Sequence, residues 1–163
     1  MALPTADAGD VLEGQTEVVD AVLAASRVFV AVASNALAGL SPEVTLPQFR
    51  ALVLLDARGT MTVAELAAEL GVAPSTASRM CDRLVTKKLV RRALDPADRR
   101  RMRLTLHAAG RDLIAASTKR RKQQIARLLK TIPPAERTRL SAALQVLIAA
   151  AESSGHGSAP LVR

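Results

Sequence analysis

Four residues in the stretch "TVAELAAELGVAPSTASRM" (62–80) indicate two short helices joined by a tight turn. Thr62 followed three residues later by Glu65 is a capping box, which predicts the start of a helix. Gly71 predicts the end of that helix after about nine residues, and Pro74 suits the first position of the next one. Two short helices separated by a Gly-Val-Ala turn are typical of a helix-turn-helix motif.

The second of these helices has a clear division of faces. Ala77, Cys81 and Leu84, with Met80, lie at helical spacing and are expected to face the core. The polar side chains on the other side predict contacts with DNA, because the first turn of such a helix enters a major groove and an arginine can reach a guanine edge there. The predicted contact residues are Ser75, Thr76, Ser78, Arg79 and Arg83.

A β-hairpin is predicted directly after the motif. Residues 89–94 are interpreted as a short strand, and an Asp-Pro-Ala-Asp turn follows. Met102, Leu104 and Leu106 then alternate with polar residues, which is the period of a half-buried strand. The tip carries Arg99, Arg100 and Arg101, so the whole unit is interpreted as a winged helix-turn-helix with arginines on the wing.

Charge is concentrated in the same part of the chain. The net charge is +8, yet residues 1–56 carry seven acids and two bases, whereas residues 79–103 carry ten bases and three acids. A solvated charged face would spread both signs more evenly, so this concentration favours a polyanion partner. With two Phe and no Tyr or Trp, the chain lacks the aromatic platforms on which single-stranded nucleic acids stack.

The rest of the chain predicts long helices. Residues 10–37 are apolar on two faces, which in a chain of this size suggests packing against a partner chain. Two further helices are expected over 108–130 and 135–152, with Pro133 and Pro134 ending the first. The predicted class is mainly α with a small β-hairpin wing. Its parts are a flexible N-terminus (1–9), a helical dimerisation region (10–40 and 107–152), a winged helix-turn-helix lobe (45–106) and a disordered tail (153–163).

Other classes of function have little support in the sequence. Cys81 is the single cysteine, which favours a reducing, cytoplasmic setting, and the acidic N-terminus does not resemble a signal peptide. Residues 21–40 are apolar, but Arg27 within them favours a buried helix over a membrane span. No metal-ligand spacing, nucleophile elbow or P-loop is present, so we expect no metal, no cofactor and no enzyme activity. The basic run 118–124 is interpreted as a solvated helix face, with a second DNA contact as the alternative.

Two segments together resemble the MarR family of bacterial transcription regulators. "DPADRRRMRLTLHAAGR" (95–111) resembles the family's wing signature, and "LGVAPSTASRMCDRLVTKKLVRR" (70–92) resembles its recognition-helix segment. The resemblance covers about residues 10–150. It implies a homodimer whose recognition helices read successive major grooves of a pseudo-palindromic operator, with wing arginines in the flanking minor grooves. It also assigns the recognition-helix contacts named above, places Arg99, Arg100 and Arg101 on the wing, and makes Asp98 the acid that positions a wing arginine.

Three departures from the family pattern carry expectations of their own. Lys88 stands where the family has Gly, and a left-handed residue other than Gly costs about 1 kcal/mol. His107 replaces Thr at the expected N-cap of the fifth helix. The resemblance implies an effector pocket between the dimerisation helices and the DNA-binding lobe, and the scarcity of aromatics predicts that this pocket is mostly aliphatic, compatible with an apolar or phenolic ligand or with none. We therefore expect an effector-released repressor, with a constitutive architectural DNA-binding protein as the alternative.

Overall fold

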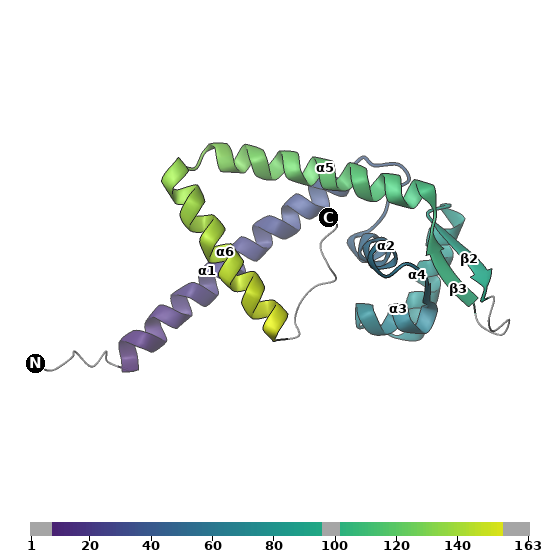
Figure 1. Ribbon diagram of the computed structural model, residues 1–163, viewed down its shortest axis with the longest axis horizontal. Helices are drawn as coiled ribbons and strands as arrows, with labels where there is room; N and C mark the ends of the chain where they lie inside the picture. The colour runs from purple at the N-terminus through teal and green to yellow at the C-terminus, as the bar shows by residue number, and fades with distance from the viewer. Residues whose placement is uncertain (1–7, 96–101, 155–163) are drawn as a thin grey trace, which may run out of the picture.

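The computed structural model describes residues 8–95 and 102–154, which form six helices and a small three-stranded sheet (Figure 1). In these ranges the chain is mainly helical with a β wing, as the sequence predicts. The predictions for Pro96–Ala97 and for Asp98, Arg99, Arg100 and Arg101 lie outside the described residues. The elements are α1 (Ala8–Leu37), α2 (Leu46–Arg58), β1 (Met61–Thr62), α3 (Val63–Leu70), α4 (Pro74–Thr86), β2 (Val90–Leu94), β3 (Met102–Leu106), α5 (Ala108–Lys130) and α6 (Pro134–Ser153).

These elements form a compact lobe with three long helices extending from it (Figure 1). The lobe contains α2, α3, α4 and the sheet, and α5 leads away from the end of the sheet. Helices α1 and α6 lie apart from the lobe along most of their length. Helix α1 begins at Ala8, two residues before its predicted start, and α6 extends through Ser153, one residue beyond its predicted end.

Local capping determines where the helices of the lobe begin. The predicted capping box is present before α3, with the Thr62 N–H donating to Glu65 Oε2 at 2.7 Å and Thr62 Oγ1 accepting from the Glu65 N–H. A second capping box precedes α2, between Thr45 and Gln48. Gly71 ends α3 with a φ of 67°, in the left-handed region that a residue without a Cβ adopts at no steric cost.

The antiparallel sheet has the order β1-β3-β2, and β1 is a strand that the sequence pattern did not predict. In the β2–β3 hairpin Leu94 is opposite Met102 and Arg92 is opposite Leu104. Leu104 is fully buried, whereas Met102 is 40% exposed. The alternation that predicted a half-buried strand therefore holds at the base of the hairpin only, because its outer end extends past the core.

The end of α4 keeps the left-handed turn that the family usually builds with glycine. Lys88 has a φ of 57°. Its N–H donates to the Val85 carbonyl at 2.9 Å, and the Leu89 N–H donates to the Leu84 carbonyl at 3.0 Å. This pair of bonds is a Schellman motif, and the apolar contact that accompanies such motifs is available because Leu84 and Leu89 are both fully buried. Lys88 therefore adopts a strained backbone conformation, and β2 begins two residues later, at Val90.

Close packing also positions the start of α5. His107 is the N-cap, as predicted, with Nδ1 accepting from the Ala109 N–H at 3.4 Å. At Gly110 a Cβ would lie 2.4 Å from the Leu89 carbonyl oxygen, so only glycine permits this approach of α5 to the start of β2. Helix α5 ends at Lys130, as predicted, but the two prolines lie beyond its end, where Pro133 is the N-cap of α6 and Pro134 its first residue.

Burial is very uneven between the lobe and the long helices. The core is formed mainly by leucines of α2, α3 and α4, with Leu104 of β3 and Ile114 of α5. Helix α6 has no buried residue. Among the α1 side chains that the structure describes, those near the end of the helix are buried, whereas seven large apolar ones are exposed: Val18, Val19, Val22, Leu23, Val28, Phe29 and Val30. Among the described residues no helix is both long and apolar enough to cross a membrane.

Candidate nucleic-acid interface

Helix α4 presents a polar face that the rest of the lobe leaves open. Ala77, Cys81 and Leu84 are buried, as predicted, and they anchor the helix on α3 and the sheet. The predicted contact residues lie on the outer side: Ser75, Thr76, Arg79 and Arg83 are exposed and Ser78 is half-buried. The N-cap Ala73 contributes no side-chain hydrogen bond, so the exposed first turn keeps a free donor in the Ser75 N–H within the described ranges. Free amide donors and small hydroxyl groups at a helix N-terminus suit an anion.

An ion pair connects α4 with the wing. Arg92 Nη1 of β2 lies 2.9 Å from Asp82 Oδ1 of α4. Both side chains are partly exposed, so the pair contributes little to stability. Its effect is positional, because it fixes the orientation of the helix against β2 and neutralises Asp82. Within the described ranges Arg79 and Arg83 form no ion pair, which leaves a cationic outer face.

The outer end of the hairpin is held by a second ion pair that sequence reasoning missed. Arg103 Nε of β3 lies 2.5 Å from Asp95 Oδ2, and the Asp95 side chain is only 7% exposed. The hydrogen bond to Asp95, together with the charge of that carboxylate, raises the pKa of Arg103 above its ordinary value. Arg103 is opposite Ala93 in the register, so Asp95 is its diagonal neighbour across the hairpin. This pair joins the two sides of the hairpin, next to the arginine-rich segment.

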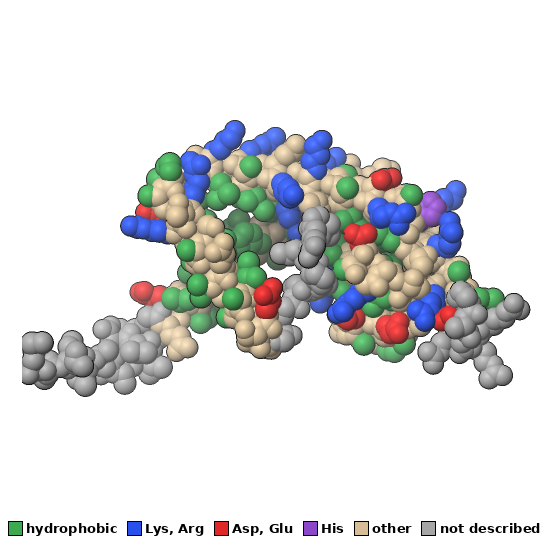
Figure 2. Space-filling view, in the orientation of Figure 1, with side chains coloured by type: hydrophobic (Ala, Val, Ile, Leu, Met, Phe, Trp, Pro, Cys, Tyr) green, Lys and Arg blue, Asp and Glu red, His purple; other side chains and the backbone are tan. Residues whose placement is uncertain are grey.

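Basic side chains are concentrated over the lobe and along α5. Figure 2 shows Lys and Arg on the lobe that carries α4 and the hairpin, and a further row along the outer edge of α5. Beside the recognition face, Lys87 Nζ donates to the Glu43 carbonyl, while Lys88 and Arg91 are exposed. The described part of the lobe therefore has the concentration of positive charge that the sequence predicts.

Cys81 is a structural residue of this interface and faces away from it. It is 1% exposed and belongs to the core cluster. Burial raises the pKa of its thiol, an effect that the nearby Arg92 only partly offsets. A buried, protonated thiol is a poor nucleophile. Within the described ranges no group of His, Cys, Asp and Glu residues has the arrangement of a metal site.

Comparison with known proteins gives a consistent result. The MarR family model matches residues 43–101. The HTH-type transcriptional regulator MT0903.1 of Mycobacterium tuberculosis is 31% identical over 114 residues, which cover 70% of this chain and 80% of that protein. The HTH-type transcriptional regulator YsmB of Bacillus subtilis is 37% identical over 82 residues, which are 50% of this chain and 56% of that protein.

Solved structures show the same fold over most of the chain. The crystal structure of RV1404 from Mycobacterium tuberculosis is similar with a TM-score of 0.74 and 37% identity, covering 90% of this chain and 96% of that one. The structure of a single-site mutant of MepR from S. aureus bound to an oligodeoxyribonucleotide is similar with a TM-score of 0.63 at 23% identity, covering 79% of this chain and 94% of that one. At that identity the second similarity concerns the fold alone.

Proposed function

Because this chain belongs to the MarR family of helix-turn-helix transcription regulators, which are not enzymes, we propose that it is a cytoplasmic homodimeric repressor of transcription. It binds a pseudo-palindromic operator in double-stranded DNA and is released from it by a small-molecule effector. The observation that carries the DNA-binding part is the outer face of α4, where Arg79 and Arg83 are exposed, without ion pairs in the described ranges, beside the hydroxyl groups of the first turn. A mutant of MepR, which has the same fold, is bound to an oligodeoxyribonucleotide in its solved structure.

The dimer is inferred from apolar surface that a single chain leaves uncovered. Helix α6 has no buried residue, and four of its large apolar side chains are exposed: Leu140, Val146, Leu147 and Ile148. Helix α1 adds seven more, and Figure 2 shows hydrophobic surface along both helices. Exposed apolar surface of this extent is typical of an obligate interface. The dimerisation region is thus 10–40 and 107–152, and the DNA-binding lobe is 45–106.

In the dimer, each α4 enters a major groove and the two half-sites lie about one helical turn, or 34–36 Å, apart. The wing arginines Arg99, Arg100 and Arg101, with Asp98 holding one of them in position, contact the flanking minor grooves. Arg103 and Asp95 support this role, because they fix the outer end of the hairpin, next to the arginine-rich segment. Repression follows when the bound dimer covers a promoter.

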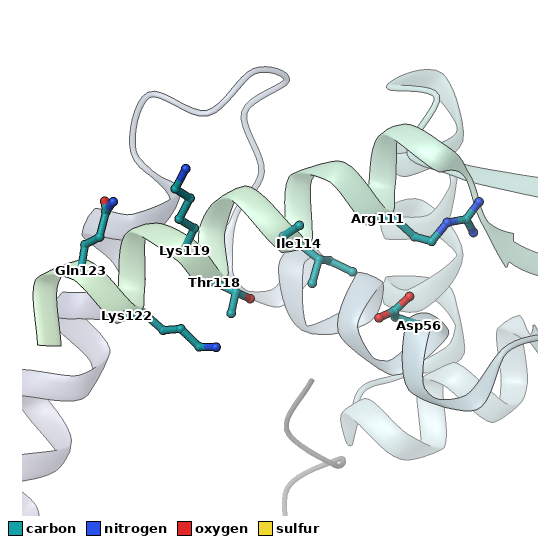
Figure 3. A pocket seen from close by; sticks show the side chains of 8 residues that line it. Asp56, Arg111, Ile114, Thr118, Lys119, Lys122 and Gln123 are labelled. Atoms are coloured by element: carbon teal, nitrogen blue, oxygen red, sulfur yellow. The ribbon is translucent and has the colours of Figure 1, made fainter. Parts of the chain in front are cut away.

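A cavity between α2 and α5 supports effector control. It has a volume of about 550 Å³ and lies at the border of the lobe and the dimerisation region, where the sequence predicts an effector pocket. Figure 3 shows Lys122 and Thr118 pointing from α5 toward the side where Asp56 of α2 lies. Ile114 and the stem of Lys122 supply apolar surface, and the ammonium group suits a phenolate. A ligand here favours a dimer geometry in which the two α4 helices no longer match the DNA.

Footprinting of the full chain on genomic DNA tests the proposal. We expect one or a few protected sites that contain an inverted repeat and overlap promoters, and a reporter driven by such a promoter should become more active when the repeat is scrambled. An architectural DNA-binding protein would instead protect DNA with no preferred site, and no compound would release it. That outcome would contradict the proposed repressor and support a constitutive architectural DNA-binding protein.

A further inference from the structure

The outer end of the β2–β3 hairpin carries two large apolar side chains that the fold leaves uncovered. Leu94 of β2 is 56% exposed and Met102 of β3 is 40% exposed, and the two residues are opposite each other in the antiparallel register. Opposite residues of neighbouring strands lie on one face and close enough to pack together. Leu94 and Met102 therefore form one apolar surface, here called the wing pair, at an end of the hairpin that lies at the edge of the molecule (Figure 1).

The wing pair is on the face of the hairpin that is turned toward α4. Side chains alternate between faces along a strand, so Leu94 shares its face with Arg92, two residues earlier. Arg92 Nη1 lies 2.9 Å from Asp82 Oδ1 of α4, and the register partner of Arg92, Leu104, is fully buried. The wing pair continues this face past the ion pair with α4, beyond the end of the core.

The surroundings of the wing pair are positively charged. Arg79 lies on the exposed face of α4, about one turn before Asp82, and forms no ion pair within the described ranges. Arg91 of β2 is exposed as well. A second copy of this surface would be repelled, because it carries the same charge. Duplex DNA complements both parts of the surface, since its phosphates attract the cations and the C–H groups of its sugars provide apolar contacts at the groove edge.

We propose that Leu94 and Met102 pack on deoxyribose rings at the edge of the minor groove, between the half-site that α4 reads and the flank that the wing reaches. This inference rests on the proposed function, and it adds an apolar contact to the ionic contacts of the wing arginines. Binding of apolar side chains to sugars releases no counterions from the phosphates. The wing pair therefore adds affinity that does not depend on salt, which distinguishes it from every arginine of the interface.

The test compares four variants of the full chain on the DNA that the wild type selects. Leu94→Ala and Met102→Ala remove apolar surface, whereas Leu94→Met and Met102→Leu keep it and are the matched controls. Both residues are exposed, so circular dichroism should show an unchanged fold in all four variants. We expect each alanine variant to lose about tenfold or more in operator affinity, because a dimer loses the contact twice, and to keep the salt dependence of the wild type. The controls should bind within about threefold of the wild type.

Hydroxyl-radical cleavage of the bound DNA provides the second readout, because these radicals abstract hydrogen atoms from deoxyribose. The wild type and both controls should protect sugars on each side of the operator that the alanine variants leave open to cleavage. Alanine variants with unchanged affinity or unchanged sugar protection would overturn the proposal. So would a loss of affinity with a flatter salt dependence, because phosphate contacts would then have been lost. In each of these cases the wild type still binds its operator and the proposed function stands, whereas a wild type that binds no duplex DNA contradicts both.

Discussion

Replacing Phe29 of α1 with alanine should weaken the dimer strongly without unfolding the lobe. Phe29 is 47% exposed in the single chain. An aromatic side chain buries about 150–250 Å², so roughly 70–120 Å² of Phe29 remains for a partner to cover. At about 25 cal/mol per Å², and allowing for the part that alanine retains, the loss is about 1.5–2.5 kcal/mol per protomer. Because the dimer is two-fold symmetric, each substitution removes this contact twice. The loss of dimerisation free energy is then about 3–5 kcal/mol, which raises the dimer Kd by about 10² to 10⁴.

Sedimentation equilibrium over a range of concentrations measures this shift, and circular dichroism verifies that helix content is kept at high concentration. Met102→Ala is the matched control, because Met102 is also a large apolar side chain and is 40% exposed, but it lies at the outer end of the hairpin. The control should leave the dimer Kd unchanged. A Phe29→Ala variant that dissociates at the same concentration as the wild type would refute the assignment of α1 to the interface.

Four other changes have defined outcomes. Arg79→Ala should relax base preference at one or two base pairs per half-site by about 1–3 kcal/mol each, and identical selection profiles would make Arg79 a positioning residue only. Arg100→Ala should lower affinity for all sequences and flatten the salt dependence by up to about one unit per lost phosphate contact, twice per dimer, which titrations at several salt concentrations measure. Lys88→Gly should stabilise the fold by about 1 kcal/mol in denaturant unfolding, since φ is 57° there, and a loss of stability would argue against strain at the turn. Burial raises the pKa of the Cys81 thiol, so on raising the pH this thiol ionises first in the unfolded chain. The free energy of unfolding should therefore fall as pH rises through the thiol's ordinary pKa near 9, and the Cys81→Ala variant should lack that pH dependence.

Local signals in the sequence predicted the elements of the lobe well. The capping box at Thr62, the stop at Gly71 and the start at Pro74 each depend on a few neighbouring residues, and the structure confirms all three. Thr45 and Gln48 have the same spacing before α2 and form a second capping box there. Strand β1 has two residues, which is too short to show a period.

Features that depend on tertiary placement could not be predicted in the same way. The pair of Asp95 with Arg103 requires the hairpin register, and the pair of Asp82 with Arg92 requires the packing of α4 on β2. The apolar face of α6 predicted burial, yet no residue of α6 is buried in the single chain. Its covering surface belongs to the partner that we propose.

The most direct test of the central claim varies the spacing of the operator. Intact chain is first used to select DNA, and its affinity is then measured for the selected inverted repeat and for the same repeat with about five base pairs, half a helical turn, inserted between the half-sites. We predict that two chains bind one repeat and that the insertion abolishes specific binding, because the two α4 helices of one dimer cannot reach half-sites on opposite faces of the duplex. Equal affinity for both duplexes would contradict a dimeric regulator that reads an inverted repeat.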